Sequence, residues 1–109
     1  MANFGAIYST EGISTPSLIA GNGSTGVQVL ASNPARIGFS VQNVGTTTAW
    51  ILIGGTATSS VYNYALKGGS GNNDGTGGSI SFFSGAVPTG IITLYGASSA
   101  IVTTCEITI

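Results

Sequence analysis

The fold class is decided by the last nine residues of the chain, which read Ile101-Val102-Thr103-Thr104-Cys105-Glu106-Ile107-Thr108-Ile109. Most of the odd-numbered residues in this run are apolar, and most of the even-numbered ones are polar. Successive side chains of a strand point to opposite faces, so this period of two predicts a β-strand with one face in a core. We expect the odd-numbered face, with Cys105 as a small buried hydrophobe, to point inward and the face with Glu106 to point outward.

Seven further segments predict strands by the same criteria of alternation and β-branched or aromatic content. In residues 37–44 the alternation places Ile37, Phe39 and Val41 on one face, whereas residues 49–53 are apolar on both faces, as in a central strand. No segment has a helical period, and turn residues separate the runs. Eight short strands predict an all-β fold, an antiparallel β-sandwich of the jelly-roll type. The seven segments are residues 17–20, 27–31, 37–44, 49–53, 61–66, 80–83 and 91–95.

The length of the chain, 109 residues, allows one hydrophobic core. We expect a single β-sandwich domain over residues 17–109. Residues 1–16 precede it, either as a first strand or as an arm that becomes ordered only against a neighbouring molecule. Residues 67–79 predict a long, flexible, glycine-rich surface loop, and its single carboxylate, Asp74, is too few ligands for a calcium site.

Charged and metal-binding side chains are scarce: the chain has two basic residues, three acidic residues, one cysteine and no histidine. Two basic residues cannot neutralise the several phosphates on which nucleic-acid affinity depends, so we expect no nucleic-acid partner. The sets of residues needed for a metal site, a catalytic triad or a carboxylate pair cannot be assembled from one chain. We therefore expect neither an enzyme nor a cofactor.

The cellular context is indicated by three further observations. The first basic residue is Arg36, so we expect no secretory leader, which needs a basic start. The longest apolar run, residues 49–53, is far too short to span a bilayer as a helix, and we expect no membrane partner. A single cysteine cannot close an internal disulfide, which favours folding in a reducing compartment.

The surface composition predicts association. Charged residues make up 5% of the chain, against about 25% in an average domain, and the mean hydropathy is +0.44. A surface so poor in charge favours self-association, and we expect a homo-oligomer, specifically a trimer. Trp50, Tyr62 and Tyr64 are the candidates for the subunit interface, with core packing and a sugar-stacking platform as the alternatives. Arg36 follows a turn and is either a solvated charge or an anchor for carboxylate and carbonyl groups.

The order of several short motifs resembles that of small β-rich structural proteins of tailed bacteriophages. In those proteins a leucine-alanine-asparagine turn with an arginine leads into a strand ending in asparagine-x-glycine, and glycine pairs and a glycine-alanine-valine segment follow. The resemblance covers roughly residues 27 to 108. Two features depart from it: the Cys105-Glu106-Ile107 run, and the glycine loop, which looks like an insertion. The matching segments are Val29 to Gly45, Leu66-Lys67-Gly68-Gly69, Ser84-Gly85-Ala86-Val87 and Ile101 to Thr108.

The resemblance implies a virion component made in the bacterial host cytoplasm. Within that class it implies a head decoration, or cement, protein that sits as a trimer on the outer surface of the capsid. The partner would be the major capsid protein, and the role would be to stabilise the expanded lattice. Head fibre, neck or tail components and a glycan-binding β-sandwich module are the alternatives. Our candidates for the capsid contact are Phe4, Ile7, Tyr8 and Arg36.

Overall fold

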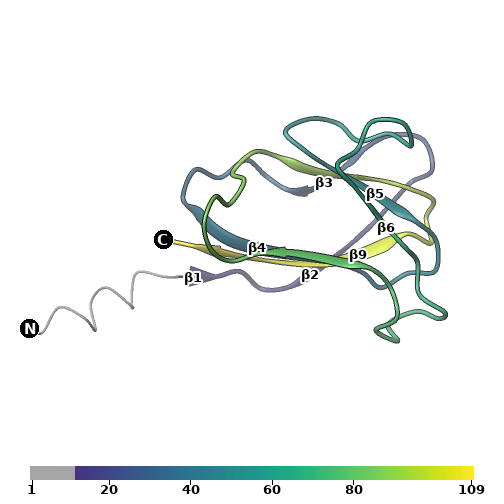
Figure 1. Cartoon of the computed structure of the whole chain (residues 1–109). Helices are drawn as coiled ribbons and strands as arrows, with labels where there is room; N and C mark the ends of the chain where they lie inside the picture. Colours follow the sequence, from purple (N-terminus) through teal and green to yellow (C-terminus); the bar gives the residue numbers. More distant parts are fainter. Residues whose placement is uncertain (1–11) are drawn as a thin grey trace, which may run out of the picture.

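The computed structural model describes residues 12–109, and this part of the chain contains nine β-strands joined by loops (Figure 1). All eight predicted strands are present, with ends shifted by at most three residues, and β1 lies within residues 1–16, where a first strand was one of the two alternatives. Residues 12–109 contain no helix that is long and apolar enough to cross a membrane. The strands are β1 Gly12–Ile13, β2 Ser17–Ala20, β3 Val27–Leu30, β4 Arg36–Asn43, β5 Ala49–Ile53, β6 Tyr64–Leu66, β7 Ser79–Phe82, β8 Ile92–Tyr95 and β9 Ile101–Thr108.

The strands form two antiparallel sheets that stack face to face (Figure 1). The five-stranded sheet has the order β1-β9-β4-β7, with β2 also pairing with β9, and the four-stranded sheet has the order β3-β8-β5-β6. Strands that follow one another in the chain therefore alternate between the sheets from β2 to β5. This is the connectivity of a jelly roll, so the predicted fold class is confirmed.

The core lies between the sheets and is built from fully buried aliphatic and aromatic side chains. Phe39 and Val41 contribute to it from β4, and the Phe39 ring stacks on that of Phe82 with 5.1 Å between centroids. The opposite sheet contributes Ile51 from β5 and Leu94 from β8. Burial of these side chains supplies most of the stabilisation of the fold, at about 25 cal/mol per Å² of apolar surface.

The inward face of β9 is the opposite of the one predicted. Val102 is fully buried and Thr104 is 3% exposed, whereas Cys105 is half-buried and faces outward. Strand pairing sets this orientation. Val41 on β4 lies opposite Thr104 on β9, and the side chains of paired residues point to the same face of the sheet, which here is the core face. The buried hydroxyl of Thr104 donates to the carbonyl of Ser40 at 2.8 Å, so a polar residue is accommodated inside.

A β-bulge changes the direction of side chains at the start of β4. The pairing with β9 shifts between Arg36 and Gly38. As a result the Arg36 side chain, rather than that of Ile37, lies inside next to Phe39. The prediction that Ile37 shares the core face with Phe39 is therefore wrong, because a bulge adds one residue and interrupts the alternation.

The turn after β4 is held by a buried amide. Asn43 is 1% exposed, and its Nδ2 donates to the carbonyls of Thr47 and Leu66, while its Oδ1 accepts from the backbone N–H of Gly45. Gly45 passes so close to the next turn that a Cβ on it would lie 2.1 Å from the carbonyl oxygen of Ser99. The asparagine-x-glycine motif therefore marks a place where two turns touch.

Gly45→Ala is expected to lower the free energy of unfolding by about 3 kcal/mol or more, because the added methyl group meets backbone atoms that cannot rotate away. Gly71→Ala is the matched control: its Cβ would lie 3.5 Å from Asp74, an ordinary contact. Urea denaturation of the two variants measures the difference. Equal stabilities would show that the contact at Gly45 does not constrain the fold.

Candidate functional site

Arg36 is a buried side chain that donates hydrogen bonds to four different residues. Its Nε donates to the Glu106 carboxylate at 2.7 Å, and its side chain has no exposed area. Its NH1 group donates to the carbonyls of Pro88 and Gly90 at 2.8 and 3.0 Å, and its NH2 group donates to the carbonyl of Ala31 at 2.7 Å. These four bonds use four of the five N–H donors of a guanidinium.

These contacts correct the prediction that Arg36 touches a capsid, because a side chain without exposed area cannot reach a partner. The alternative of a solvated charge is excluded on the same ground. The expected chemistry, an arginine fork on a carboxylate and carbonyl groups, is present, but all of its acceptors belong to the same chain. The guanidinium also lies 5.5 Å from the centre of the Phe39 ring, a cation–π contact with the core.

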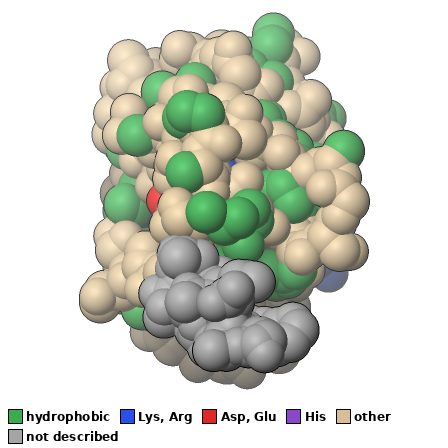
Figure 2. Space-filling model, turned by 90° about the vertical axis from the view of Figure 1, so that its left-hand side faces the viewer, with side chains coloured by type: hydrophobic (Ala, Val, Ile, Leu, Met, Phe, Trp, Pro, Cys, Tyr) green, Lys and Arg blue, Asp and Glu red, His purple; other side chains and the backbone are tan. Residues whose placement is uncertain are grey.

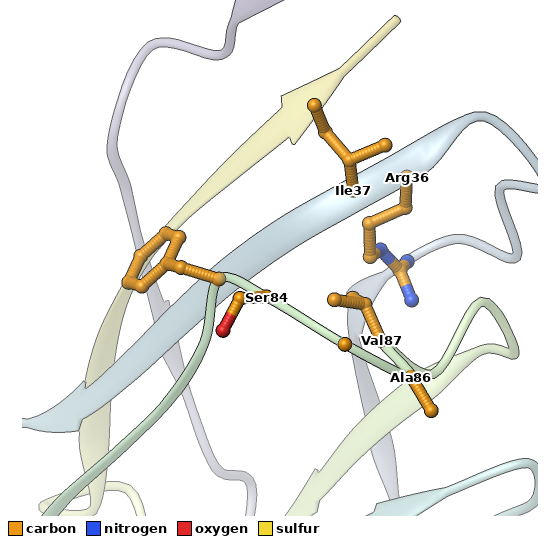
Figure 3. Close-up of a pocket in the computed structure, with 7 residues that line it drawn as sticks. Arg36, Ile37, Ser84, Ala86 and Val87 are labelled. Atoms are coloured by element: carbon orange, nitrogen blue, oxygen red, sulfur yellow. The ribbon is translucent and has the colours of Figure 1, made fainter.

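A hollow of about 470 Å³ opens next to Arg36 at the end of the sandwich (Figure 3). Val87 and Ala86 lie beside the guanidinium in the close-up, and Ile37 points away from it. Hydrophobic side chains gather on this end of the molecule (Figure 2). Because four of the five guanidinium donors are already bound to acceptors of this chain and Glu106 balances the charge, the hollow is poorly suited to an anion. Its lining is Arg36, Ile37 and residues 83–87.

Arg36→Met is expected to lower the free energy of unfolding by about 3 to 5 kcal/mol, because it leaves the Glu106 carboxylate and three backbone carbonyls without their donor. The double variant Arg36→Met/Glu106→Leu removes the unpaired charge and should recover part of that loss. Urea denaturation measures both. A double variant no more stable than the single one would contradict the importance of the ion pair.

The outer face of the five-stranded sheet begins with an apolar row at the same end of the sandwich. Ile13 on β1 lies opposite Ile107 on β9, which lies opposite Gly38 on β4. The ring of Phe83 covers Gly38, since a Cβ there would be 2.6 Å from its Cδ1. Ile13 is 73% exposed and Phe83 is 51% exposed. Large apolar side chains at these exposures are typical of an interaction surface rather than of a solvated sheet.

The remainder of this face is uncharged and made mostly of short side chains. Its rows across β9, β4 and β7 are Cys105-Ser40-Ser81 and Thr103-Gln42-Ser79, and Leu18 on β2, 64% exposed, lies opposite Thr103. Within residues 12–109 no charged side chain belongs to this face. The charged residues of that range are Arg36 and Glu106, which pair with each other, and Lys67 and Asp74, which lie between β6 and β7.

The structure does not bring the three predicted interface aromatics together. Trp50 lies on the outer face of the four-stranded sheet, 6.0 Å from the ring of Tyr95. Tyr64 packs against the core and the edge of Phe82, with 6.3 Å between ring centroids, as the core-packing alternative has it. Tyr62 is 43% exposed between β5 and β6. A subunit-interface role for these residues stays a prediction.

The remaining candidates are three N-terminal residues and a metal site. Phe4, Ile7 and Tyr8, predicted to touch a capsid, lie outside the described residues. Residues 12–109 hold no group of three or more His, Cys, Asp or Glu side chains close enough to bind a metal ion. The exposed residues Leu18 and Phe83 were missed as interaction residues, although both lie in predicted strands. In residues 80–83 the alternation places Phe83 on the face opposite to Ile80 and Phe82, whereas Leu18 and Ile19 are both apolar, so the register with β9 decides which of them faces outward.

The loop between β6 and β7 is exposed, as predicted, but it is folded around one carboxylate. Asp74 accepts hydrogen bonds from the backbone N–H groups of Gly71 and Thr76 and from the Thr76 hydroxyl, at 2.7 to 3.0 Å. The N–H of Asn73 donates to the carbonyl of Val44, which fixes the loop to the end of β4. The Thr76 hydroxyl and then the backbone donors lower the pKa of Asp74 below its ordinary value of 3.8.

Because the folded pKa of Asp74 is lowered, its bonds stabilise the loop fully above the unfolded value and lose their effect as the pH falls through the folded value. The amide resonances of Gly71 and Thr76 should therefore titrate below pH 3.8 in NMR spectra. Thr76→Val removes the hydroxyl at nearly constant volume and should raise that midpoint. Identical midpoints in both proteins would show that Thr76 does not hold the carboxylate.

Comparisons with known proteins add little to this description. No protein-family model matches the chain, and no curated protein matches it. A solved structure described as "Bacillus endospore appendages form a novel family of disulfide-linked pili" overlaps with 90% of this chain and 85% of that chain. The TM-score is 0.49 and the sequence identity is 12%, and an overlap at that level carries no argument about function. The class defined by the structure itself is a small all-β protein of the jelly-roll type.

Proposed function

We propose that the chain is a non-catalytic structural subunit, which acts by assembling with copies of itself and with a larger protein lattice. The observation that carries this proposal is the exposure of Ile13, Leu18 and Phe83 around a sheet face without charge. A monomer that stays free in solution normally carries charge over about a quarter to a third of its surface. The ion pair of Arg36 and Glu106 is directed inward and serves the fold.

More specifically, the subunit is a head decoration protein of a tailed bacteriophage, a trimer bound to the major capsid protein on the outer surface of the capsid. The sequence resemblance supports this proposal, and the residues that carry it lie where the fold is most constrained. Arg36 and Asn43 are buried and make four and three side-chain hydrogen bonds, and a Cβ on Gly68 would lie 2.3 Å from a backbone atom of Thr46. By binding only the expanded lattice, such a trimer stabilises that state by mass action.

Another virion position, in a head fibre, the neck or the tail, is compatible with the same surface. A glycan-binding module is the second candidate, because the neighbouring rings of Trp50 and Tyr95 on the outer face of the four-stranded sheet form an aromatic pair that could stack on a sugar. Binding on a glycan array that is lost in Trp50→Ala would favour this candidate over the decoration protein.

The purified protein is expected to sediment with three times its chain mass of 10.7 kDa. It should also bind expanded empty phage heads and not unexpanded ones, because only the expanded lattice presents the complete site. Sedimentation velocity and co-pelleting with the two kinds of head measure these properties. A monomer at micromolar concentration would contradict the assembly, and equal binding to both kinds of head would contradict the stabilising role.

A deletion separates the trimer contact from the capsid contact. It ends at residue 11, because Gly12 and Ile13 pair with β9 and Ser14 exchanges hydrogen bonds with Glu106. The shortened protein is expected to keep its fold and to remain a trimer, but to lose binding to phage heads, since Phe4, Ile7 and Tyr8 are our candidates for that contact. Full binding by the shortened protein would contradict the role of those residues.

A further inference from the structure

We infer that the outer face of the five-stranded sheet is covered by a second copy of this chain, an inference that rests on the proposed function and assigns the surface through which copies meet. The face is defined by the outward residues of β1, β2, β9, β4 and β7, together with Phe83. Three properties support the inference: the composition of the face, its neutrality and its area.

The face is shaped for close contact with another protein surface. Its central rows are Cys105-Ser40-Ser81, all short side chains, and Thr103-Gln42-Ser79, in which only Gln42 is longer. Short side chains let another protein surface approach the strands closely. Larger apolar groups stand at the margin, with Ile13 and Phe83 at one end. An uncharged centre with apolar groups at its margin is a surface that excludes water when covered.

The lack of charged side chains among the described residues of this face indicates which kind of protein surface covers it. A partner with an ordinary charged surface would bury charges on this face without counter-ions, which costs several kcal/mol for each ion. An anionic partner such as a nucleic acid would find no lysine or arginine among the described residues of the face. A second copy meets the requirement, because the exposed charges of residues 12–109, Lys67 and Asp74, are both confined to the β6–β7 loop.

The area is close to that of the smallest specific interfaces. Strands about 4.8 Å apart, with residues rising about 3.4 Å each, give the 26 residues of β1, β2, β4, β7 and β9 a projected area of about 420 Å². Covering it with a similar area of a second copy buries about 850 Å² in total before the exposed side chains at the margin are added, against about 1,000 Å² for the smallest specific interfaces. A ring in which every copy both covers and is covered uses each such contact cooperatively.

The open edge of the sheet extends the contact surface. The pairings place β1 and β2 on the same side of β9, and neither strand carries a charged residue or a lysine that would repel a neighbour. Leu18, on the outward face of β2, is 64% exposed at this edge. The apolar margin therefore runs along the edge of the sheet formed by β1 and β2.

A matched pair of glutamine substitutions tests the inference. Gln42→Lys places a charge in the centre of the face, between Thr103 and Ser79. Gln28→Lys makes the same change at an exposed position of β3, in the other sheet. Sedimentation velocity over a range of concentrations should show a loss of at least tenfold in the association constant for Gln42→Lys and none for Gln28→Lys. Thermal unfolding checks that both variants fold.

Cys105 supplies a second readout without any substitution, because its thiol belongs to the face and is half-buried in the isolated chain. A soluble maleimide should label it at least tenfold more slowly in the wild-type oligomer than in Gln42→Lys. Three results would overturn the inference. Equal association and labelling of the two variants in an oligomeric wild type would overturn this surface alone. A monomeric wild type with a reactive thiol would overturn the proposed assembly as well. A monomer with a protected thiol would show that residues 1–11 of the same chain cover the face.

Discussion

The ion pair between Arg36 and Glu106 is the interaction on which one end of the sandwich depends. Glu106 is on β9, and the carbonyl groups bound by the same guanidinium come from the segments after β3 and before β8. One side chain therefore connects both sheets at a place where the chain has no regular pairing. Bonds between an arginine and carbonyl oxygens have fixed directions, so they define the path of these segments more narrowly than apolar contact would.

Because the ion pair is used inside the fold, few charged side chains remain on the described surface. With Arg36 and Glu106 enclosed, the described surface is formed by hydroxyl, amide and apolar groups, apart from the β6–β7 loop. Such a surface is compatible with water but has little to repel another copy of itself. This distribution suits the structural subunit that we propose.

The positions of the strands could be predicted from the sequence, but the direction of their faces could not always be. In β9 both faces carry β-branched residues, so the sequence of Val102, Thr103 and Thr104 does not show which face points into the core. The register with β4 decides this. The environment of Arg36 was beyond prediction for another reason. Two of its four acceptors are backbone carbonyls more than 50 residues away in the chain, and every residue type offers a carbonyl.

In the described part of the chain, residues 12–109, the exposed charged residues are Lys67 and Asp74, and this has a consequence for how fast and under what conditions the protein meets its partners. A surface with so few ions produces almost no long-range field, so diffusional encounters are not steered and follow the rates of neutral proteins, about 10⁵ to 10⁶ M⁻¹s⁻¹. Salt has little to screen in such a complex. Temperature, which governs the strength of apolar contacts, is the variable to which the assembly responds.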